Sequence, residues 1–81
     1  MADRVIKFRR LREILKTYGV EWVPSKGKGS HGSFCKFMDN GVFSYPVPHR
    51  KDVHVGYVRG CRKKFRLTEE HGVSDHDFYN A

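Results

Sequence analysis

Hydrophobic residues recur at helical spacing near both ends of this chain and at strand spacing between them, and this order restricts the fold more than any other feature. Apolar residues three and four positions apart share one face of a helix. The first set is Phe8, Leu11, Leu15 and Tyr18; the second is Val58, Cys61 and Phe65, which Tyr57 and Leu67 can extend. Asp3 is the expected N-cap of the first helix, and Gly19 is expected to end it in a left-handed conformation.

The residues between the two helices have the features of three β-strands. The expected strands are residues 20–25, 33–38 and 42–47. Asp39-Asn40-Gly41, between the second and third strands, is typical of a hairpin turn, because Asn and Gly adopt positive φ at little cost. Pro46 indicates an edge position or the end of the third strand, since proline cannot donate a hydrogen bond to a neighbouring strand.

The predicted order is therefore helix, strand, strand, strand, helix in a single α+β domain. A chain of 81 residues can bury only one core. Three antiparallel strands need an apolar cover on one face, and two amphipathic helices on that face would supply it. This is the arrangement of double-stranded-RNA-binding domains. The domain core is expected at about residues 6–67, and Ser74 is expected to cap a short turn or helix in the acidic segment 69–81.

Positive charge is confined to the first 68 residues. All 16 Lys and Arg and five of the nine acids lie there, a net charge of +11, whereas the last 13 residues contain four acids and no Lys or Arg. Such a field favours salt-dependent binding of nucleic acid; the alternative is a solvated surface without a partner. The predicted RNA contacts are Lys36, Arg50, Lys51, Arg59, Arg62, Lys63 and Lys64. Aromatic residues that could stack on bases are Trp22, Phe43 and Tyr45, although core packing is preferred for the last two.

Several classes of protein are disfavoured. No run approaches the roughly 18 apolar residues that a membrane span needs, and the first 20 residues resemble an amphipathic helix more than a signal peptide, so we expect a cytoplasmic protein without membrane attachment. Cys35 and Cys61 are 26 positions apart without a C-x-x-C pattern, which favours two reduced, buried thiols over a disulfide or zinc site. We expect no cofactor.

A basic, glycine-rich segment precedes the second strand and ends in a histidine, Gly27-Lys28-Gly29-Ser30-His31. RNA carries its own nucleophile, the ribose 2′-hydroxyl, so its cleavage requires proton transfers and charge stabilisation at the phosphate. An ordinary histidine titrates near pH ~6.5 and can transfer those protons, a role worth roughly 10² to 10⁴ in rate. His31 is therefore the catalytic candidate. Phosphate oxygens could be held by Lys26, Lys28, the backbone N–H groups of Gly29 and Ser30, and the Ser30 hydroxyl.

A second proton-transfer group is not specified by this segment. His49 and His54 follow the third strand and are candidates, but their spacing does not show whether either approaches His31. Ordinary surface histidines remain the favoured interpretation of both, and also of His71 and His76.

Gly-Ser-His at 29–31, with the aromatic Phe34 three residues later, resembles the signature of the HicA (YcfA-like) toxin family. The resemblance covers about residues 6–67 and includes the first helix, the Asn-Gly turn, the Pro-Val-Pro step before His49 and the second helix. It implies a double-stranded-RNA-binding-like fold, metal-independent endoribonuclease activity on mRNA, a single catalytic histidine at His31 and inhibition by a HicB-type antitoxin. The chain departs from the family at Gly32, where many members have a second histidine, and in its longer acidic end.

Two other classes remain open. The chain could be an RNA-binding module that uses the same fold without cutting, with His31 as a phosphate or base contact. It could also be an interaction protein whose basic surface receives an acidic partner, in which case RNA would bind weakly. Turnover of RNA separates the first interpretation from both alternatives.

Overall fold

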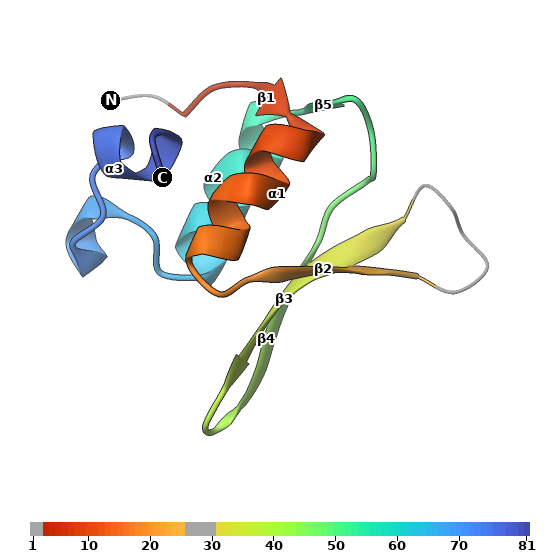
Figure 1. The fold of residues 1–81 in the computed structure, drawn as a ribbon, viewed down its shortest axis with the longest axis horizontal. Coiled ribbons are helices and arrows are strands. Elements are labelled where there is room, and N and C mark those ends of the chain that lie inside the picture. Colours follow the sequence, from red (N-terminus) through yellow and green to blue (C-terminus); the bar gives the residue numbers. More distant parts are fainter. Residues whose placement is uncertain (1–2, 26–30) are drawn as a thin grey trace.

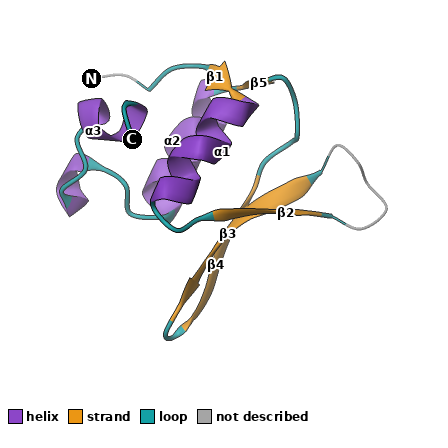
Figure 2. Cartoon of the chain, viewed as in Figure 1, coloured by secondary structure: helices purple, strands orange, loops and turns teal. Residues whose placement is uncertain are grey.

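The structure, a computed structural model that describes residues 3–25 and 31–81, is an α+β fold with a three-stranded antiparallel sheet and helices on one of its faces (Figure 1). Figure 2 shows the elements in the same view. Their bounds are β1 (Ile6–Lys7), α1 (Phe8–Thr17), β2 (Glu21–Pro24), β3 (Gly32–Met38), β4 (Gly41–Pro46), β5 (Asp52–Val53), α2 (Val55–Lys64), η1 (Glu69–His71) and α3 (Asp75–Tyr79). The predicted α+β class and antiparallel three-stranded sheet are confirmed.

The sheet has the order β2-β3-β4, which makes β4 an edge strand, as Pro46 predicts. Trp22, Phe34 and Tyr45 lie side by side across the three strands and face the helices. Phe34 is fully buried, whereas Phe37, three positions along β3, is 64% exposed. The strand spacing therefore assigns one face of the sheet to the core and leaves the other uncovered.

The predicted hairpin between β3 and β4 is confirmed, but only one residue of the segment 39–41 has a positive φ. Asp39 and Asn40 form the turn and neither has a positive φ. Gly41 has φ +137°, in a region that side-chain-bearing residues rarely adopt. The expectation that Asn40 would also take positive φ is wrong.

The first helix begins later than the expected N-cap at Asp3 predicts, and Asp3 does not cap it. Ile6 pairs with Val53 and Lys7 with Asp52 in a two-stranded ribbon, so α1 starts only at Phe8. The Phe8 N–H donates to the Lys51 carbonyl oxygen over 3.0 Å, which continues the ribbon into the helix. This pairing joins residues more than 40 positions apart, which a local hydrophobic pattern does not reveal.

Both long helices end in the same left-handed motif. After α1, Gly19 has φ +83° and the Val20 N–H donates to the Leu15 carbonyl oxygen, which confirms the predicted helix end. After α2, the equivalent position is Arg66 with φ +59°, and the Leu67 N–H donates to the Arg62 carbonyl oxygen. Arg66 occupies this conformation without the freedom of glycine, so it stores backbone strain.

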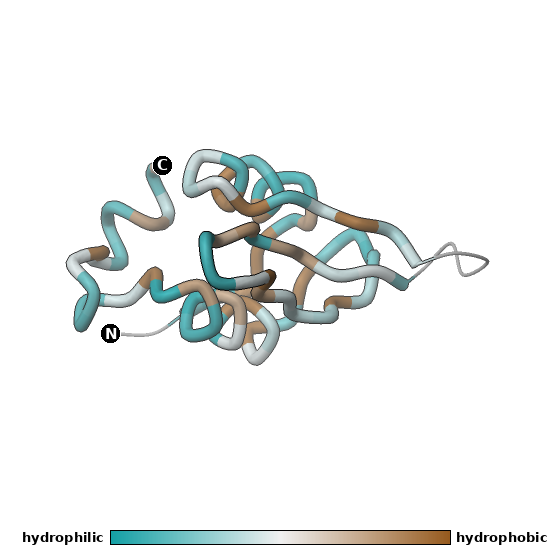
Figure 3. The backbone as a smooth tube through the Cα atoms, turned by 90° about the horizontal axis from the view of Figure 1, so that it is seen from below, coloured by the Kyte–Doolittle hydropathy of each residue, from teal (hydrophilic) through white to brown (hydrophobic). Residues whose placement is uncertain are grey.

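The core lies between the helices and the sheet. Its buried members from these elements are Phe8, Leu11, Ile14, Leu15, Val20, Phe34, Val47, Val53, Val58, Cys61 and Phe65. The alternation of hydrophobic and hydrophilic residues along the chain is visible in Figure 3. A Cβ atom at Gly60 would overlap the Tyr45 phenol, so glycine at this position allows α2 to approach β4 closely.

The acidic C-terminal segment belongs to the same packed unit. The Ser74 hydroxyl accepts a hydrogen bond from the Asp77 N–H over 3.0 Å, which confirms the predicted cap. Phe78 is fully buried and Tyr79 is 6% exposed, so both rings join the hydrophobic core. The segment therefore covers the helical layer instead of extending into solvent as a free tail.

The Arg62 side chain fastens this segment to the rest of the molecule. Its guanidinium donates to the Leu67 carbonyl oxygen over 2.8 Å, to Asp3 over 2.9 Å, and to Asp75 and the Val73 carbonyl oxygen. It also lies over the Phe78 ring, 4.8 Å from the centroid. We call Arg62, Asp3, Asp75 and Tyr79 the Arg62 clamp, since the Tyr79 hydroxyl donates to Asp3 over 2.8 Å.

Candidate functional site

His31 is exposed at the start of β3, and backbone hydrogen bonds fix its position on both sides. Its carbonyl oxygen accepts from the Ser25 N–H over 3.0 Å, next to β2. The adjacent Gly32 carbonyl oxygen accepts from the Val47 N–H over 3.1 Å, after β4. A Cβ atom at Gly32 would overlap the Trp22 ring, so a second histidine at this position would require Trp22 to move. His31 therefore stands on a rigid sheet end, with its side chain accessible.

A cleft of about 290 Å³ contains His31. Its other lining residues are Ser25, Gly32, Ser33, Pro46, Val47, Pro48 and Tyr57. Tyr57 comes from α2 and is 39% exposed, so it is not part of the apolar stripe that it could extend in the sequence. It adds a tyrosine side chain to the lining of the cleft. The sequence analysis did not predict that Tyr57 lines the site. Its position, one residue before the buried stripe of Val58, Cys61 and Phe65, could have indicated that it faces away from the core.

The structure does not bring His49 or His54 into the His31 cleft. His54 occupies the N-cap position of α2 and lines an adjoining cleft of about 240 Å³ with Pro48, Arg50, Asp52, Val53 and Tyr57. The His49 ring packs on Phe8, with 4.3 Å between ring centroids, and on Trp22, with 5.7 Å. The titratable side chain that lines the cleft together with His31 is therefore Tyr57, and neither His49 nor His54 lines it.

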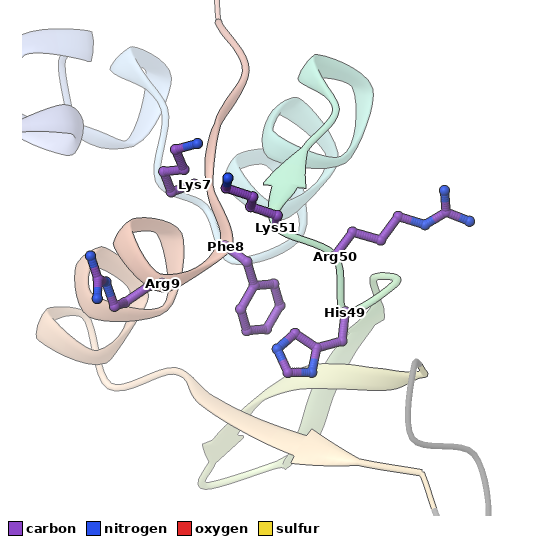
Figure 4. A pocket seen from close by; sticks show the side chains of 6 residues that line it. All are labelled: Lys7, Phe8, Arg9, His49, Arg50 and Lys51. Carbon is purple, nitrogen blue, oxygen red and sulfur yellow. The ribbon is translucent and has the colours of Figure 1, made fainter.

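A third hollow, which we call the His49 cavity, has a volume of about 470 Å³ and is lined by Lys7, Phe8, Arg9, His49, Arg50 and Lys51. In Figure 4 the His49 and Phe8 rings point toward each other, while the Arg50 side chain extends away from them. Lys7 forms an ion pair with Asp52 over 3.0 Å. Arg9, Arg50 and Lys51 have no acidic partner within 4 Å among residues 3–25 and 31–81. Their charges are therefore available to an anion.

Arg62 must be withdrawn from the predicted RNA contacts. Its side chain is 5% exposed and its guanidinium is occupied by the Arg62 clamp. Burial opposes its charge, but Asp3 and Asp75 outweigh this effect, so the pKa of Arg62 is raised. Arg62 is buried because Asp3 and Asp75 neutralise it, and a sequence pattern that treats α2 as a basic outer face does not show this.

The other predicted contacts are distributed over several places. Arg50 and Lys51 lie together at the His49 cavity. Arg59, Lys63 and Lys64 are exposed on α2, with Arg59 Nε 3.6 Å from Asp3, and Lys36 is half-buried on β3. Lys26, Lys28, Gly29 and Ser30 lie outside the described residues. Among the residues that the structure describes, Arg50 lines the cleft beside His54, which shares Pro48 and Tyr57 with the His31 cleft.

The aromatic residues considered as base platforms are used mainly in packing. Trp22 makes edge contacts with Phe8 and Phe34, with ring centroids 4.8 and 4.9 Å apart. Phe43 and Tyr45 pack against the core, as preferred from the sequence. Burial raises the pKa of Tyr45. None of these three rings lines the His31 cleft.

Both cysteines are free; Cys61 is buried and Cys35 half-buried. No group of three metal-binding side chains occurs within the described part of the chain. In that same part, no helix is long and apolar enough to cross a membrane. Comparisons with protein-family models, curated proteins and solved structures found no match to this chain. Its function must therefore be inferred from the site itself.

Proposed function

We propose that this protein is a metal-independent endoribonuclease that cleaves mRNA, with His31 as its catalytic residue. The observation that carries the proposal is an exposed histidine, fixed by the backbone of two neighbouring segments, in a cleft that Tyr57 also lines. The fold supports it, since a three-stranded antiparallel sheet with helices on one face is compatible with a double-stranded-RNA-binding-like domain. The net charge of +11 on residues 1–68 favours a polyanionic substrate.

The chemistry follows from the groups in the cleft. A His31 ring nitrogen accepts the proton of the ribose 2′-hydroxyl, and the 2′-oxygen attacks the adjacent phosphorus. The bond from phosphorus to the 5′-oxygen breaks, which leaves a 2′,3′-cyclic phosphate, and the 5′-oxygen takes up a proton. Tyr57 also lines this cleft, and in the proposal its hydroxyl donates to a phosphate oxygen or to the leaving oxygen. No metal ion is needed, because the nucleophile and the leaving group both belong to the RNA.

The test is incubation of purified protein with single-stranded RNA in excess EDTA, followed by gel electrophoresis. We expect the parent protein to cut and His31→Ala to lose about 10² to 10⁴ in rate. His71→Ala, which changes an exposed histidine in η1, is the matched control and should retain activity. Equal cutting by the parent and His31→Ala would refute the assignment of His31. Intact RNA with a retarded band in every lane would instead support the non-catalytic RNA-binding module.

The proposal includes a protein inhibitor of the HicB type, which covers His31 in the cytoplasm. An acidic partner would associate rapidly with a surface of this charge, because complementary potentials raise the encounter rate. His31 and Tyr57 are both accessible to such a partner. A complex in which His31 stays open to solvent and RNA would rule out steric blocking as the mechanism.

A further inference from the structure

The His31 cleft is one end of a longer groove. The cleft and its neighbour beside His54 share Pro48 and Tyr57. That neighbour and the His49 cavity in turn share Arg50. The three hollows therefore adjoin one another along residues 46–54, the connection from the end of β4 to the start of α2, which is visible in Figure 1. We call these three neighbouring hollows together the crossover groove.

The two ends of the crossover groove differ in chemistry. At one end lie His31 and Tyr57, which are groups for proton transfer and hydrogen bonding. At the other end, Arg9, Arg50 and Lys51 line the same cavity as the His49 ring, which packs on Phe8 and Trp22. These three cations have no acidic partner within 4 Å in the part of the chain that the structure describes. The acidic side chain that lines the groove, Asp52, is neutralised by Lys7. The groove thus combines free positive charge with aromatic surface.

We propose that the crossover groove holds a single strand of RNA, and that the His49 cavity is a second subsite for a phosphate and its base, remote from the cleaved bond. The position of the cleaved bond at His31 rests on the proposed function. Cations that follow the backbone, interleaved with aromatic faces for bases, characterise sites for single strands. The His49 cavity measures about 470 Å³, within the size range of small-molecule pockets, which suits one nucleotide better than a double helix.

The second subsite predicts that RNA length matters. A dinucleotide fills the His31 cleft alone, whereas an oligonucleotide of about eight nucleotides also reaches Arg50 and Lys51. The added contacts are charge-assisted hydrogen bonds, each roughly twice as strong as a neutral one. We therefore expect the longer RNA to bind at least about tenfold more tightly than the dinucleotide, and this difference should depend on Arg50 and Lys51.

The experiment measures binding by fluorescence anisotropy in the His31→Ala background, so that no substrate is consumed. Adding Arg50→Ala and Lys51→Ala should weaken binding of a labelled eight-nucleotide single strand at least about tenfold and leave the dinucleotide nearly unaffected. The slope of log K against log salt should fall by about 0.7, since the subsite holds one phosphate and each phosphate neutralised on a single strand contributes about 0.7. Both side chains are exposed, and the Lys51 carbonyl oxygen that binds Phe8 is retained in the variant.

The matched control is Arg12→Ala with Lys16→Ala, which removes the same charge from exposed positions farther along α1. Equal losses in the two double variants would mean that only overall charge matters, which would overturn the subsite. Equal binding of a duplex of the same sequence would overturn the single-strand assignment. Because binding is measured without turnover, a protein that binds as predicted but never cuts would refute the proposed function and leave the subsite standing. A protein that cuts RNA but binds the longer and shorter RNA equally well would refute the subsite and leave the proposed function standing.

Discussion

Replacing Arg62 by alanine should remove a large part of the stability of this protein. The Arg62 side chain is 5% exposed, and the Asp3 and Asp75 side chains that it binds are 12% and 18% exposed. The substitution therefore leaves two carboxylates largely buried without their counter-ion and loses the contact with the Phe78 ring. Breaking a buried ion pair in this way costs about 3 to 5 kcal/mol. A chain of this length has a total stability of about 4 to 12 kcal/mol.

The assay is thermal and urea unfolding followed by circular dichroism at pH 7. Arg62→Ala should lower Tm by at least about 12 °C, at about 4 °C for each kcal/mol. Arg62→Lys keeps the charge but cannot reproduce the forked geometry, so it should lie between the parent and the alanine variant. Arg59→Ala is the control, because it removes a cation from the same helix that also contacts Asp3 but is not buried. The Arg59 side chain is 53% exposed, and its Nε lies 3.6 Å from Asp3 Oδ2. This substitution should cost no more than about 0.5 kcal/mol. A loss below about 1 kcal/mol for Arg62→Ala would refute the structural role of the clamp.

Three further predictions concern Asp3, the two thiols and Arg66. Burial raises the pKa of Asp3, but hydrogen bonds from Arg62 and Tyr79 lower it more, so its folded pKa lies below 3.8; its stabilisation is present above that pH and is lost as pH falls through the folded pKa. Asp3→Asn should therefore flatten the decline in stability between about pH 5 and 2 in urea titrations, and an unchanged acid limb would contradict this. Burial raises the pKa of Cys61 to about 12 and also raises that of Cys35. A thiol reagent at pH 8 should therefore label Cys35 slowly and label Cys61 only in denaturant. Labelling of Cys61 in the native protein would contradict this prediction and would show that the core opens. Arg66→Gly relieves the strain at φ +59° and should raise the free energy of unfolding by about 0.5 to 1 kcal/mol. This gain is smaller than the cost of about 1 to 2 kcal/mol for the left-handed conformation, because glycine gains entropy in the unfolded chain. A destabilised variant would show that the Arg66 side chain contributes more than the strain costs.

Features of the fold that depend on neighbouring residues could be predicted from the sequence. The hairpin between β3 and β4 has its turn signal and both strands within 15 residues, so local spacing fixes its register. The Ser74 cap and the left-handed Gly19 depend on contacts three to five positions away. Each of these predictions is confirmed, because the groups that decide the structure are adjacent in the chain.

Features that depend on distant partners could not be predicted. The β1–β5 ribbon pairs Ile6 with Val53, and Asp3 turns away from the helix start to bind Arg62, 59 positions later. Arg62 follows the buried Cys61 on α2 and looks like any other exposed cation until its acidic partners are placed beside it. For the site, the sequence offered His31 as the catalytic candidate before the second strand, but the approach of Tyr57 depends on how α2 crosses β4, which helical spacing does not specify.

The acidic segment determines where positive charge remains free. Asp75 neutralises Arg62 inside the clamp, and Arg10 donates to the carbonyl oxygens of Tyr79 and Ala81 at the same end of the molecule. Figure 1 shows α3 and the connection between β4 and β5 on opposite sides of the two long helices. The connection that carries Arg50 and Lys51 therefore lies on the other side of the long helices from the acidic segment. A polyanion is attracted to the groove side and repelled from the side of α3. Because Phe78 and Tyr79 are also part of the core, we expect removal of this segment to expose apolar surface and to destabilise the helical layer.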